Sequence, residues 1–383
     1  MFDIEPGSPE HGVQQLAAHV ADDVLRPRAA ELDRRGGFPT DSLAALSAAG
    51  LMGIAVPREL GGLQAGALAY SLAVTELAHA CAATTVALCV NNMVAEVLAH
   101  FGTPEQRSVH VPKLCNGEHV VGAFALSEAG AGSDPAGMRT RARRTDRGWV
   151  IDGSKLWITS GSDAGLFVVW AKTSDDPGTR GISTFLVPGD TPGLSRGKPE
   201  HKLGLRGSTT CAIEFASCEV GPDALLDEVG RGFRVAMMAL DGGRIGIASQ
   251  ALGIGRAATM AAAAWTRDRY GERDVPQGVL FALADSAMEL DAAALLTTRA
   301  AWLKTTGQPF SHQASMAKLM ASERAFAACN RALAMMGPEG QDCDGVVERL
   351  FRDVRVTMIY EGTSEVQRVV VSRDIARRFE DAR

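Results

Sequence analysis

A block of short β-rich runs between two long helical regions limits the possible folds more than any other feature of the sequence. From Gln14 to about Glu118 the apolar residues recur at helical spacing. After Gly117 the chain changes to short runs rich in Val, Ile, Phe and Trp, which Gly, Pro and Asp separate. Helical patterning returns at about Gly232 and continues to the end of the chain. Since strands and helices do not alternate, a doubly wound sheet is disfavoured.

This order predicts an α+β chain with three domains. We expect an N-terminal all-α domain over residues 1–118, a small central β-barrel or β-sandwich over residues 119–226, and a C-terminal four-helix bundle over residues 227–383. The helical stretches of the last domain are rich in Ala, Leu and Met, and we expect them at residues 233–266, 278–306, 311–336 and 345–378.

One N-terminal helix has clear predicted boundaries. Its apolar residues form a single stripe at i, i+3, i+4 and i+7 spacing: Val86, Val90, Met93, Val94, Val97, Leu98 and Phe101. Gly102 is expected to end this helix. The run Thr103-Pro104-Glu105-Gln106 then predicts a new helix, because it combines a threonine cap, a proline at the first helical position and the glutamine of a capping box.

Composition and charge argue against several classes of protein. A chain of 383 residues can bury a large core without disulfides or metals. Its formal net charge is -6 and no Lys/Arg-rich stripe stands out, so a nucleic-acid partner is not expected. The histidines lack HxxxH and HExxH spacing, and the seven cysteines form no CxxC pair, so no metal site is expected. An odd number of cysteines suits free thiols in a reducing compartment.

The sequence also bears on location. The first residues, Met1-Phe2-Asp3-Ile4-Glu5, lack the basic and apolar regions of a secretory signal. Charges interrupt the Ala-rich stretches before they reach about 18 apolar residues, so no membrane span is expected. We therefore expect a soluble, cytoplasmic protein.

Near the C-terminus, Met358-Ile359-Tyr360-Glu361-Gly362-Thr363-Ser364-Glu365 places one carboxylate between an apolar run and a turn of small residues. Ser364 and Gln367 fit a capping box that begins the last helix. Glu361 would then lie just before that helix, held rigidly but not inside it. This makes Glu361 the strongest candidate for a catalytic acid or base. The alternative is an exposed glutamate at the end of a surface helix.

A second candidate site is the run Phe124-Ala125-Leu126-Ser127-Glu128-Ala129-Gly130-Ala131-Gly132-Ser133-Asp134. Its glycines would let the backbone approach a planar or phosphorylated ligand, and free N–H groups in such a loop can bind an anion. The run lacks GxGxxG and no clear helix follows it, so a Rossmann site is disfavoured. The alternative is an ordinary hairpin loop.

Two further segments are candidates. Trp157-Ile158-Thr159 offers a large indole beside a hydroxyl, although such a strand is commonly part of a core. Asp241-Gly242-Gly243-Arg244 places two glycines in a helical pattern, at a cost of roughly 1 kcal/mol each relative to alanine. That cost indicates that a ligand or a second helix needs the space. The alternative is a simple Asp/Arg pair at i, i+3 spacing.

Taken with these segments, Arg352-Asp353 and the run Ile359-Tyr360-Glu361-Gly362-Thr363-Ser364-Glu365-Val366-Gln367-Arg368 resemble the C-terminal signature of the flavin-dependent acyl-CoA dehydrogenases. The motifs occur in the order of that family and cover essentially the whole chain. The sequence around Asp241 looks most like that of the short-chain and branched short-chain members. The resemblance implies the same three-domain fold, bound FAD and a homotetramer.

The resemblance also implies roles for individual residues. Glu361 would be the catalytic base that removes the α-proton of an acyl thioester, while hydride leaves the β-carbon for flavin N5. Contacts with the flavin cofactor would come from Phe124, Leu126, Ser127, Gly132, Ser133, Trp157, Ile158, Thr159, Thr363 and Glu365. Contacts with the substrate would come from Ser133 on the pantetheine side and from Asp241, Arg244 and Gly362.

Three more residues would contact FAD across a subunit interface. Arg267, in Arg267-Asp268-Arg269-Tyr270-Gly271, would reach the pyrophosphate, with Gln277 as its companion. Gly337 would help to hold the adenylate half. Both loops depart from the family pattern, because residues 272–275 lack the usual proline and are one residue short, and because Ala334 and Pro338 replace a glutamine and a glycine.

The implied chemistry needs a carboxylate with a raised pKa. Burial raises the pKa of a carboxyl group by up to several units, whereas a nearby helix start stabilises the anion by only about 0.3–1 kcal/mol, so we expect burial to win. The Glu361 backbone N–H and a flavin ribityl hydroxyl would stabilise the enolate.

The implied partners are an acyl-CoA or acyl-carrier-protein thioester and an electron-transferring flavoprotein as electron acceptor. Two alternatives remain on the same fold: an oxygen-using flavin monooxygenase or oxidase, and a non-enzymatic nucleic-acid-binding relative.

Overall fold

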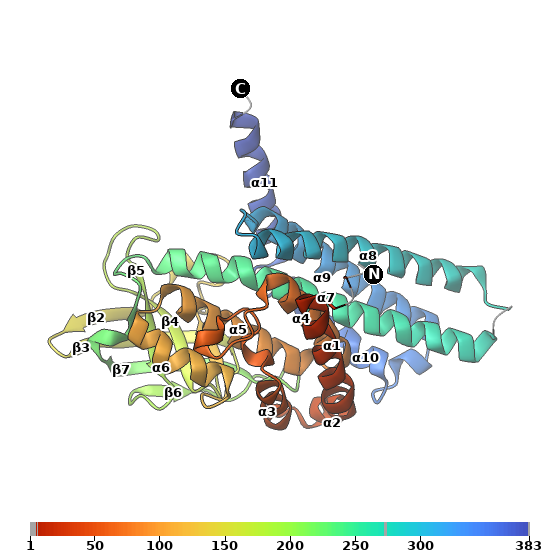
Figure 1. Cartoon of the computed structure of the whole chain (residues 1–383), viewed down its shortest axis with the longest axis horizontal. Helices are drawn as coiled ribbons and strands as arrows, with labels where there is room; N and C mark the ends of the chain where they lie inside the picture. The colour runs from red at the N-terminus through yellow and green to blue at the C-terminus, as the bar shows by residue number, and fades with distance from the viewer. Residues whose placement is uncertain (1–4, 6, 272–273, 382–383) are drawn as a thin grey trace.

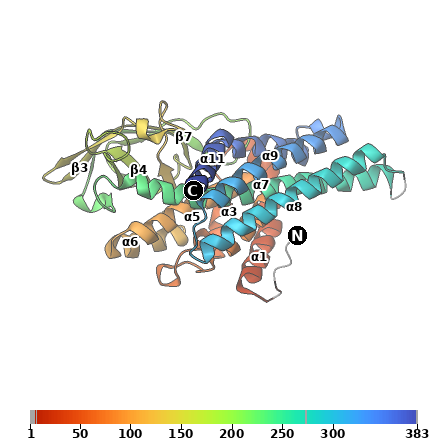
Figure 2. The ribbon, with the colours of Figure 1, turned by 90° about the horizontal axis from the view of Figure 1, so that it is seen from above.

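The computed structural model describes residue 5, residues 7–271 and residues 274–381, and its sheet lies between two helical regions of the chain. In Figure 1 the strands gather at one end of an elongated molecule, and long helices extend to the other end. Figure 2 shows the same division from above, with α7, α8 and α9 running alongside one another. The predicted α+β, three-part fold is confirmed.

The N-terminal region is entirely helical. Its α-helices are α1 (Pro9–Val20), α2 (Arg26–Arg35), α3 (Thr40–Ala48), α4 (Gly66–Ala80), α5 (Ala82–Phe101) and α6 (Pro104–Cys115). The predicted capping box before α6 is present, since the Thr103 hydroxyl accepts from the Gln106 backbone N–H and the Gln106 side chain accepts from the Thr103 N–H. α5 is long and apolar enough to cross a membrane, but 89% of its most apolar window is buried inside the protein. Its apolar stripe is therefore core, as predicted.

The central region is one mainly antiparallel sheet. Its strands are β1 (Gly122–Ala125), β2 (Arg141–Thr145), β3 (Gly148–Thr159), β4 (Leu166–Lys172), β5 (Ile182–Pro188), β6 (Leu194–Arg196), β7 (Thr210–Val220) and β8 (Leu225–Leu226). They follow the order β6-β7-β3-β2-β4-β5-β8, and β1 pairs in parallel with β4. β4 and β5 are buried on both faces, which suits the nearly continuous apolar run of β4.

The C-terminal region is built around α7 (Gly232–Tyr270), which packs against α4 and α5 of the N-terminal region and against α8 and α9. α8 (Gln277–Thr305), α9 (Ser311–Met336), α10 (Val346–Val354) and α11 (Ser364–Asp381) complete it. The helical stretch predicted at residues 345–378 is interrupted, because a 3-10 turn at Arg355–Met358 and the segment around Glu361 separate α10 from α11. α11 projects from the body of the molecule in Figure 1.

All seven cysteines are free, and six of them are buried. Among the described residues, His, Cys, Asp and Glu side chains form no group that could hold a metal ion.

Arg352 and Asp353 join the three regions at one point. Arg352 is buried and donates to both carboxylate oxygens of Asp33 in α2, at 3.0 and 2.6 Å. It also donates to Glu348 and to the carbonyl of Leu203, which follows the sheet strand β6. Asp353 accepts from the backbone N–H of Leu205 at 2.5 Å. Bidentate guanidinium–carboxylate bonds have a fixed geometry, so this cluster fixes the start of the segment that leads to Glu361.

We predict that Arg352→Leu lowers the free energy of unfolding by about 3–5 kcal/mol, because it leaves the carboxylates of Asp33 and Glu348 without their cation. Arg34→Leu, which removes an exposed partner of Glu31 on the same helix as Asp33, should cost less than about 1 kcal/mol. Urea denaturation measures both values. Equal losses in the two variants would contradict the role of the cluster.

Candidate functional site

Glu361 lies in a left-handed turn between α10 and α11. Its φ is 55° and that of Gly362 is 89°, both in the region that side chains rarely adopt. α11 begins immediately afterwards, so Glu361 does lie just outside a helix start. The predicted capping box is wrong in detail. Ser364 is the first helical residue, and the cap is Thr363, whose hydroxyl accepts from the Val366 N–H at 3.3 Å.

The predicted partner of that cap, Gln367, has a different role. Its side chain is fully buried and points back into the turn, where Nε2 donates to the carbonyls of Glu361 at 3.0 Å and Gly362 at 2.9 Å. The amide therefore holds the two left-handed residues by donating to their carbonyls. In a capping box it would instead accept from a backbone N–H.

The Glu361 carboxylate packs directly against Gly243 in α7. A Cβ atom at residue 243 would lie 2.5 Å from Oε2 and 2.8 Å from Cδ of Glu361. Oε2 is buried and has no hydrogen-bond partner among the described residues. The glycine that the sequence placed in a helix at a cost in stability thus provides the space for an acid side chain.

Burial governs the charge of this carboxylate. It raises the pKa of Glu361 to about 7, and the cations of Arg244 and Lys318 oppose the rise. Burial thus outweighs the nearby cations, and the pKa moves in the direction expected from the sequence. A carboxylate with a pKa near 7 can accept a proton at neutral pH and later release it.

Asp241 and Arg244 lie one turn apart on the same helix as Gly243. Arg244 donates to Asp241 at 2.6 Å and to Ser315 of α9 at 3.1 Å, and Ser311 also donates to Asp241. Burial raises the pKa of Asp241, and the charge of Arg244 opposes that rise. Nε of Arg244 is buried without a partner among the described residues, so the guanidinium retains a donor in this region.

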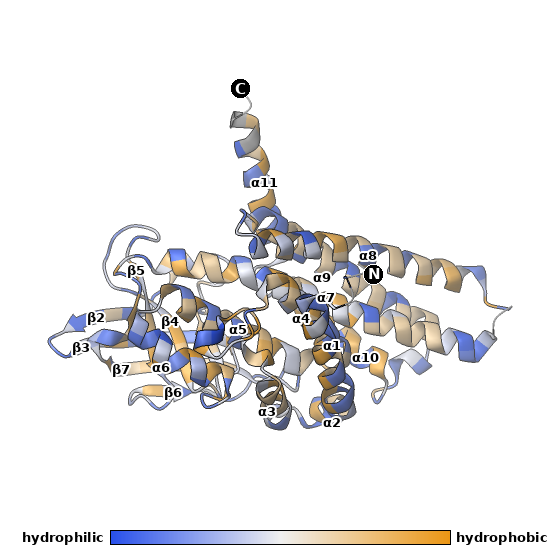
Figure 3. Ribbon diagram, in the orientation of Figure 1, coloured by the Kyte–Doolittle hydropathy of each residue, from blue (hydrophilic) through white to orange (hydrophobic). Residues whose placement is uncertain are grey.

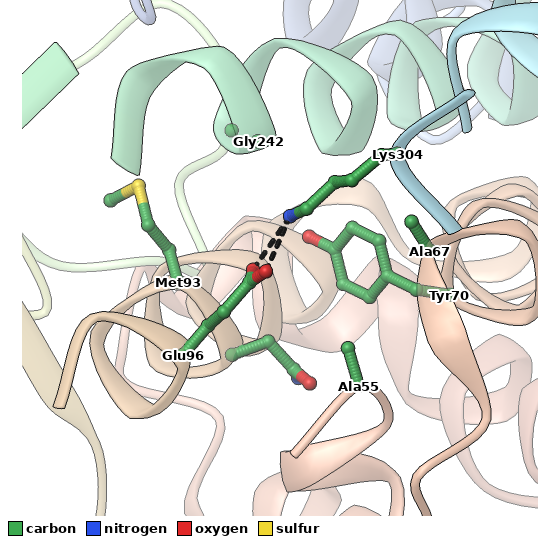
Figure 4. A pocket seen from close by; sticks show the side chains of 9 residues that line it. Ala55, Ala67, Tyr70, Met93, Glu96, Gly242 and Lys304 are labelled. Atoms are coloured by element: carbon green, nitrogen blue, oxygen red, sulfur yellow. Dashed lines mark hydrogen bonds and ion pairs between the residues drawn. The ribbon is translucent and has the colours of Figure 1, made fainter. Parts of the chain in front are cut away.

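A small cavity of about 20 Å³ lies beside Gly242 and Gly243 (Figure 4). Its remaining lining residues come from the N-terminal region and the end of α8: Ala55, Ala67, Tyr70, Asn92, Met93, Glu96 and Lys304. Lys304 pairs with Glu96 across the cavity at 2.6 Å. The Tyr70 hydroxyl occupies the space beside Gly246, where a Cβ atom would lie 2.5 Å from it. The cavity holds about one water molecule, so Tyr70 and the ion pair leave little room beside Gly242 and Gly243.

A buried ion pair fixes the loop after β1. Lys155 of β3 is buried, and its Nζ donates to Glu128 at 2.8 Å and to the carbonyl of Leu126 at 3.2 Å. Glu128 also accepts from the backbone N–H groups of Arg139 and Thr140. Burial lowers the pKa of Lys155 to about 8, with Glu128 opposing. Leu126 and Ser127 are thereby held against β3, since the Leu156 N–H donates to the Ser127 carbonyl.

Trp157 is an exposed aromatic side chain on β3, next to the fixed loop. Its φ is 62° and the residue is 59% exposed, so a left-handed kink in β3 turns a large apolar ring outward. Ile158 points into the core, and Thr159 is half-buried. The indole, the adjacent hydroxyl and the fixed loop fit a planar cofactor such as a flavin ring.

The other residues predicted near the flavin vary in position. Phe124 packs on Trp170 with ring centroids 4.3 Å apart. Gly132 and Ser133 are exposed at the loop tip, as is Glu365 in the first turn of α11. Met93 of the cavity, Leu126 of the loop and Leu240 of α7 belong to one apolar cluster.

Arg267, Gln277 and Gly337 lie elsewhere. Arg267 and Gln277 are exposed, and α7 carries Arg267 to the end of the molecule opposite the sheet (Figure 1). Gly337 is near Arg267, since Glu339 pairs with Arg269 at 3.8 Å and accepts from Trp265. Residues 272 and 273 of the intervening loop are outside the described residues. Within one chain these three residues do not join Trp157 and Glu361.

The sequence prediction did not include Lys318, Tyr70 or the Lys155–Glu128 pair. Periodicity could have found the first. Lys318 lies on the same face of α9 as the buried Ala314, Ala317, Ala321 and Ala325, where a lysine is out of place. Tyr70 gave no comparable signal, because its position depends on how α4 packs on α7.

Comparison with known proteins finds the same family in all three regions of the chain. Family profiles match for the N-terminal domain of acyl-CoA dehydrogenase at residues 9–118, the middle domain at residues 123–218 and the C-terminal domain at residues 230–376. The mitochondrial short-chain specific acyl-CoA dehydrogenase of Mus musculus is 43% identical over 371 residues, which are 96% of this chain and 90% of that protein.

Two solved structures illustrate the similarity of the fold. Butyryl-CoA dehydrogenase from Megasphaera elsdenii aligns with a TM-score of 0.94 and 34% identity, over 98% of this chain and 100% of the other. Glutaryl-CoA dehydrogenase from Mycobacterium smegmatis, in complex with FADH2, aligns with a TM-score of 0.89 and 28% identity, over 96% and 94% of the two chains.

We predict that Lys155→Met weakens FAD binding roughly tenfold to a hundredfold, because a buried Glu128 left without its cation costs about 1–3 kcal/mol and frees the loop. Lys198→Met, an exposed lysine of the same region, is the control and should bind FAD like the wild type. Flavin fluorescence on dilution measures release. Equal retention of FAD by the two variants would show that the ion pair does not hold the loop.

Proposed function

Because this chain belongs to the acyl-CoA dehydrogenase family, we propose that it oxidises a short-chain acyl-CoA to the trans-2-enoyl thioester with FAD as cofactor. The observation that carries the proposal is the Glu361 carboxylate, which packs on Gly243, has a raised pKa and keeps one oxygen without a hydrogen-bond partner in the part of the chain that the structure describes. A carboxylate in that state is suited to removing a weakly acidic proton.

In this mechanism Glu361 takes the proton from the α-carbon of the thioester. The electron pair of that C–H bond forms the new double bond as the β-hydrogen departs with its own pair. Bound FAD supplies the acceptor for that hydride. Removal of water from the site keeps the pKa of the carboxyl group high, and the Glu361 backbone N–H is assigned to the thioester carbonyl, where enolate charge develops.

We assign the flavin ring to the edge formed by Leu126, Ser127, Trp157 and Thr159. An exposed indole next to a fixed loop supports this assignment, since a bound ring would cover the apolar surface. Asp241, Arg244 and Gly362 are assigned to the substrate, because the charge of Arg244 acts on the Glu361 carboxylate, Asp241 pairs with Arg244, and Gly362 follows Glu361 in the turn.

We also propose that the protein is a homotetramer. Phe281, Met288, Leu295 and Trp302 recur every seventh residue along α8, and each is about half exposed or more. Val369, Ile375 and Phe379 are similarly exposed on the projecting helix α11, and Figure 3 shows apolar residues along both helices. Such stripes support burial against further copies of the chain.

A neighbouring chain would also give Arg267, Gln277 and Gly337 a cofactor to bind, since they lie far from the flavin edge of their own chain. Sedimentation velocity tests this assembly. A single species near four times 40.3 kDa is expected, and a monomer would contradict it.

The reduced cofactor requires an electron acceptor, which we propose to be an electron-transferring flavoprotein. Stopped-flow reoxidation would test this, with fast reoxidation by that protein and slow reoxidation by oxygen as the expected outcome. The free cysteines support a reducing, cytoplasmic location, which cell fractionation would test.

We predict that Glu361→Gln folds and retains FAD but reduces it with butyryl-CoA at least about a thousandfold more slowly, because the amide cannot accept the α-proton. In the wild type the rate should increase with pH through about 7, since the carboxyl group with its raised pKa must first lose its proton. Stopped-flow absorbance of the flavin measures both. A variant that reduces its flavin at the wild-type rate would refute the assigned base.

We predict that Tyr70→Ala shifts the preferred substrate from C4 toward C8, because it removes the ring that fills the space beside Gly246. One methylene in an apolar pocket is worth about 1–3 kcal/mol, so the ratio of kcat/KM for C8 to that for C4 should rise at least about tenfold. Tyr70→Phe, which retains the ring, is the control. A panel of C4 to C16 thioesters, on CoA and on a carrier protein, measures the change. An unchanged ratio would mean that Tyr70 does not limit chain length.

A further inference from the structure

Lys318 of α9 is a fully buried lysine, and it donates a hydrogen bond to the turn that carries Glu361. Its side chain is 0% exposed, and Nζ donates to the Gly362 carbonyl at 2.7 Å. Burying an ammonium group is costly, so a lysine on an otherwise alanine-lined helix face requires a reason.

The Gly362 carbonyl receives two donors from opposite elements. Gln367 of α11 donates to it at 2.9 Å, and Lys318 of α9 donates at 2.7 Å. The two peptides concerned have positive φ, and a side chain at Glu361 makes such a backbone unfavourable by about 1–3 kcal/mol unless its surroundings hold it. Lys318 thus acts with Gln367 to hold this strained turn in place.

The turn determines where the Glu361 carboxylate lies. Glu361 and Gly362 are adjacent, so rotation of the peptide at Gly362 would move the carboxylate away from Gly243, which it touches. From this geometry we propose that Lys318 is a positioning residue: its ammonium group fixes the Gly362 carbonyl and so aims the Glu361 carboxylate at the substrate α-carbon. The inference rests on the proposed function, and it adds to the site a residue that lies outside the sequence motifs described above.

The same ammonium group acts on the carboxylate through its charge. Burial lowers the pKa of Lys318 to about 7, with Glu361 opposing and Arg244 adding to the fall, while Glu365 and Glu323 also oppose it. For Glu361 the rise caused by burial is opposed by Arg244 of α7 and by Lys318 of α9. The phenols of Tyr70 and Tyr360 and the Cys89 thiol face the same region, and burial raises the pKa of each, so they remain neutral. Removal of Lys318 should therefore raise the pKa of Glu361.

The test measures flavin reduction by butyryl-CoA as a function of pH. Four FAD-loaded proteins are compared: Lys318→Met, Lys318→Gln, Lys318→Arg and the wild type. We expect Lys318→Met to reduce flavin on the order of tenfold to a hundredfold more slowly, since the base is misplaced. The apparent pKa of its rate should rise by about one unit. Affinity for the product crotonyl-CoA, measured by calorimetry, should change less than about threefold, because the step affected is chemical.

The other variants separate hydrogen bonding from charge. Lys318→Gln retains a donor without the charge, so its pH profile should shift as in Lys318→Met while its rate partly recovers. If Lys318→Met does not fold, this shift in Lys318→Gln decides the question. Lys318→Arg retains both properties and should return the profile to that of the wild type.

Arg331→Met removes a cation of the same helix that pairs with Glu289, and it serves as the control. It should leave the pH profile unchanged even where it lowers the melting temperature. A wild-type rate and profile in the variants that lack the charge, or an equal shift in Arg331→Met, would overturn the positioning role. Failure of Glu361→Gln to lose activity would instead overturn the proposed function itself.

Discussion

The contact between the Glu361 carboxylate and Gly243 is the constraint on which the rest of the site depends. It requires a glycine in the middle of a long helix, a left-handed turn at Glu361 and Gly362, and a buried carboxylate oxygen that has no hydrogen-bond partner among the described residues. Each of these features is unfavourable on its own. Their coincidence at one place is explained if the carboxylate must meet a substrate in a dry site.

The surrounding structure offsets those costs. α7 contacts helices of the N-terminal and C-terminal regions, so the helix that carries Gly243 is held by both. Arg352 and Asp353 fix the start of the segment that leads to the turn, through α2 and the sheet region. Gln367 and Lys318 hold the turn itself. Glu361 is thus positioned by all three regions of the chain, which is why a residue in a loop can be placed so closely.

Much of this organisation can be predicted from the sequence, because it depends on local pattern. The change from helical to strand periodicity located the sheet, Thr103 and Gln106 predicted the start of α6, and the glycines beside Asp241 indicated a nearby ligand or element. The signature around Glu361 predicted a residue just before a helix, although the capping residue proved to be Thr363 rather than Ser364. Local signals cannot distinguish neighbouring caps that differ by one residue.

What the sequence could not provide are contacts between distant segments. Tyr70 lies beside Gly246 only because α4 packs on α7, and Lys155 meets Glu128 only once β3 lies beside the loop after β1. The predicted contacts of Arg267 and Gln277 are of a further kind, because their predicted partner belongs to another copy of the chain. A sequence motif indicates that such residues have a role, but it does not contain the geometry in which they act.

The central claim is that Glu361 removes the α-proton, and exchange of that proton tests it separately from hydride transfer. With the FAD already reduced, the protein is incubated with butyryl-CoA in D2O, and deuterium at the α- and β-carbons is followed by NMR. We expect the wild type to place deuterium at the α-carbon alone and Glu361→Gln to place none above the uncatalysed background. Exchange at the α-carbon by Glu361→Gln as fast as by the wild type would contradict the account.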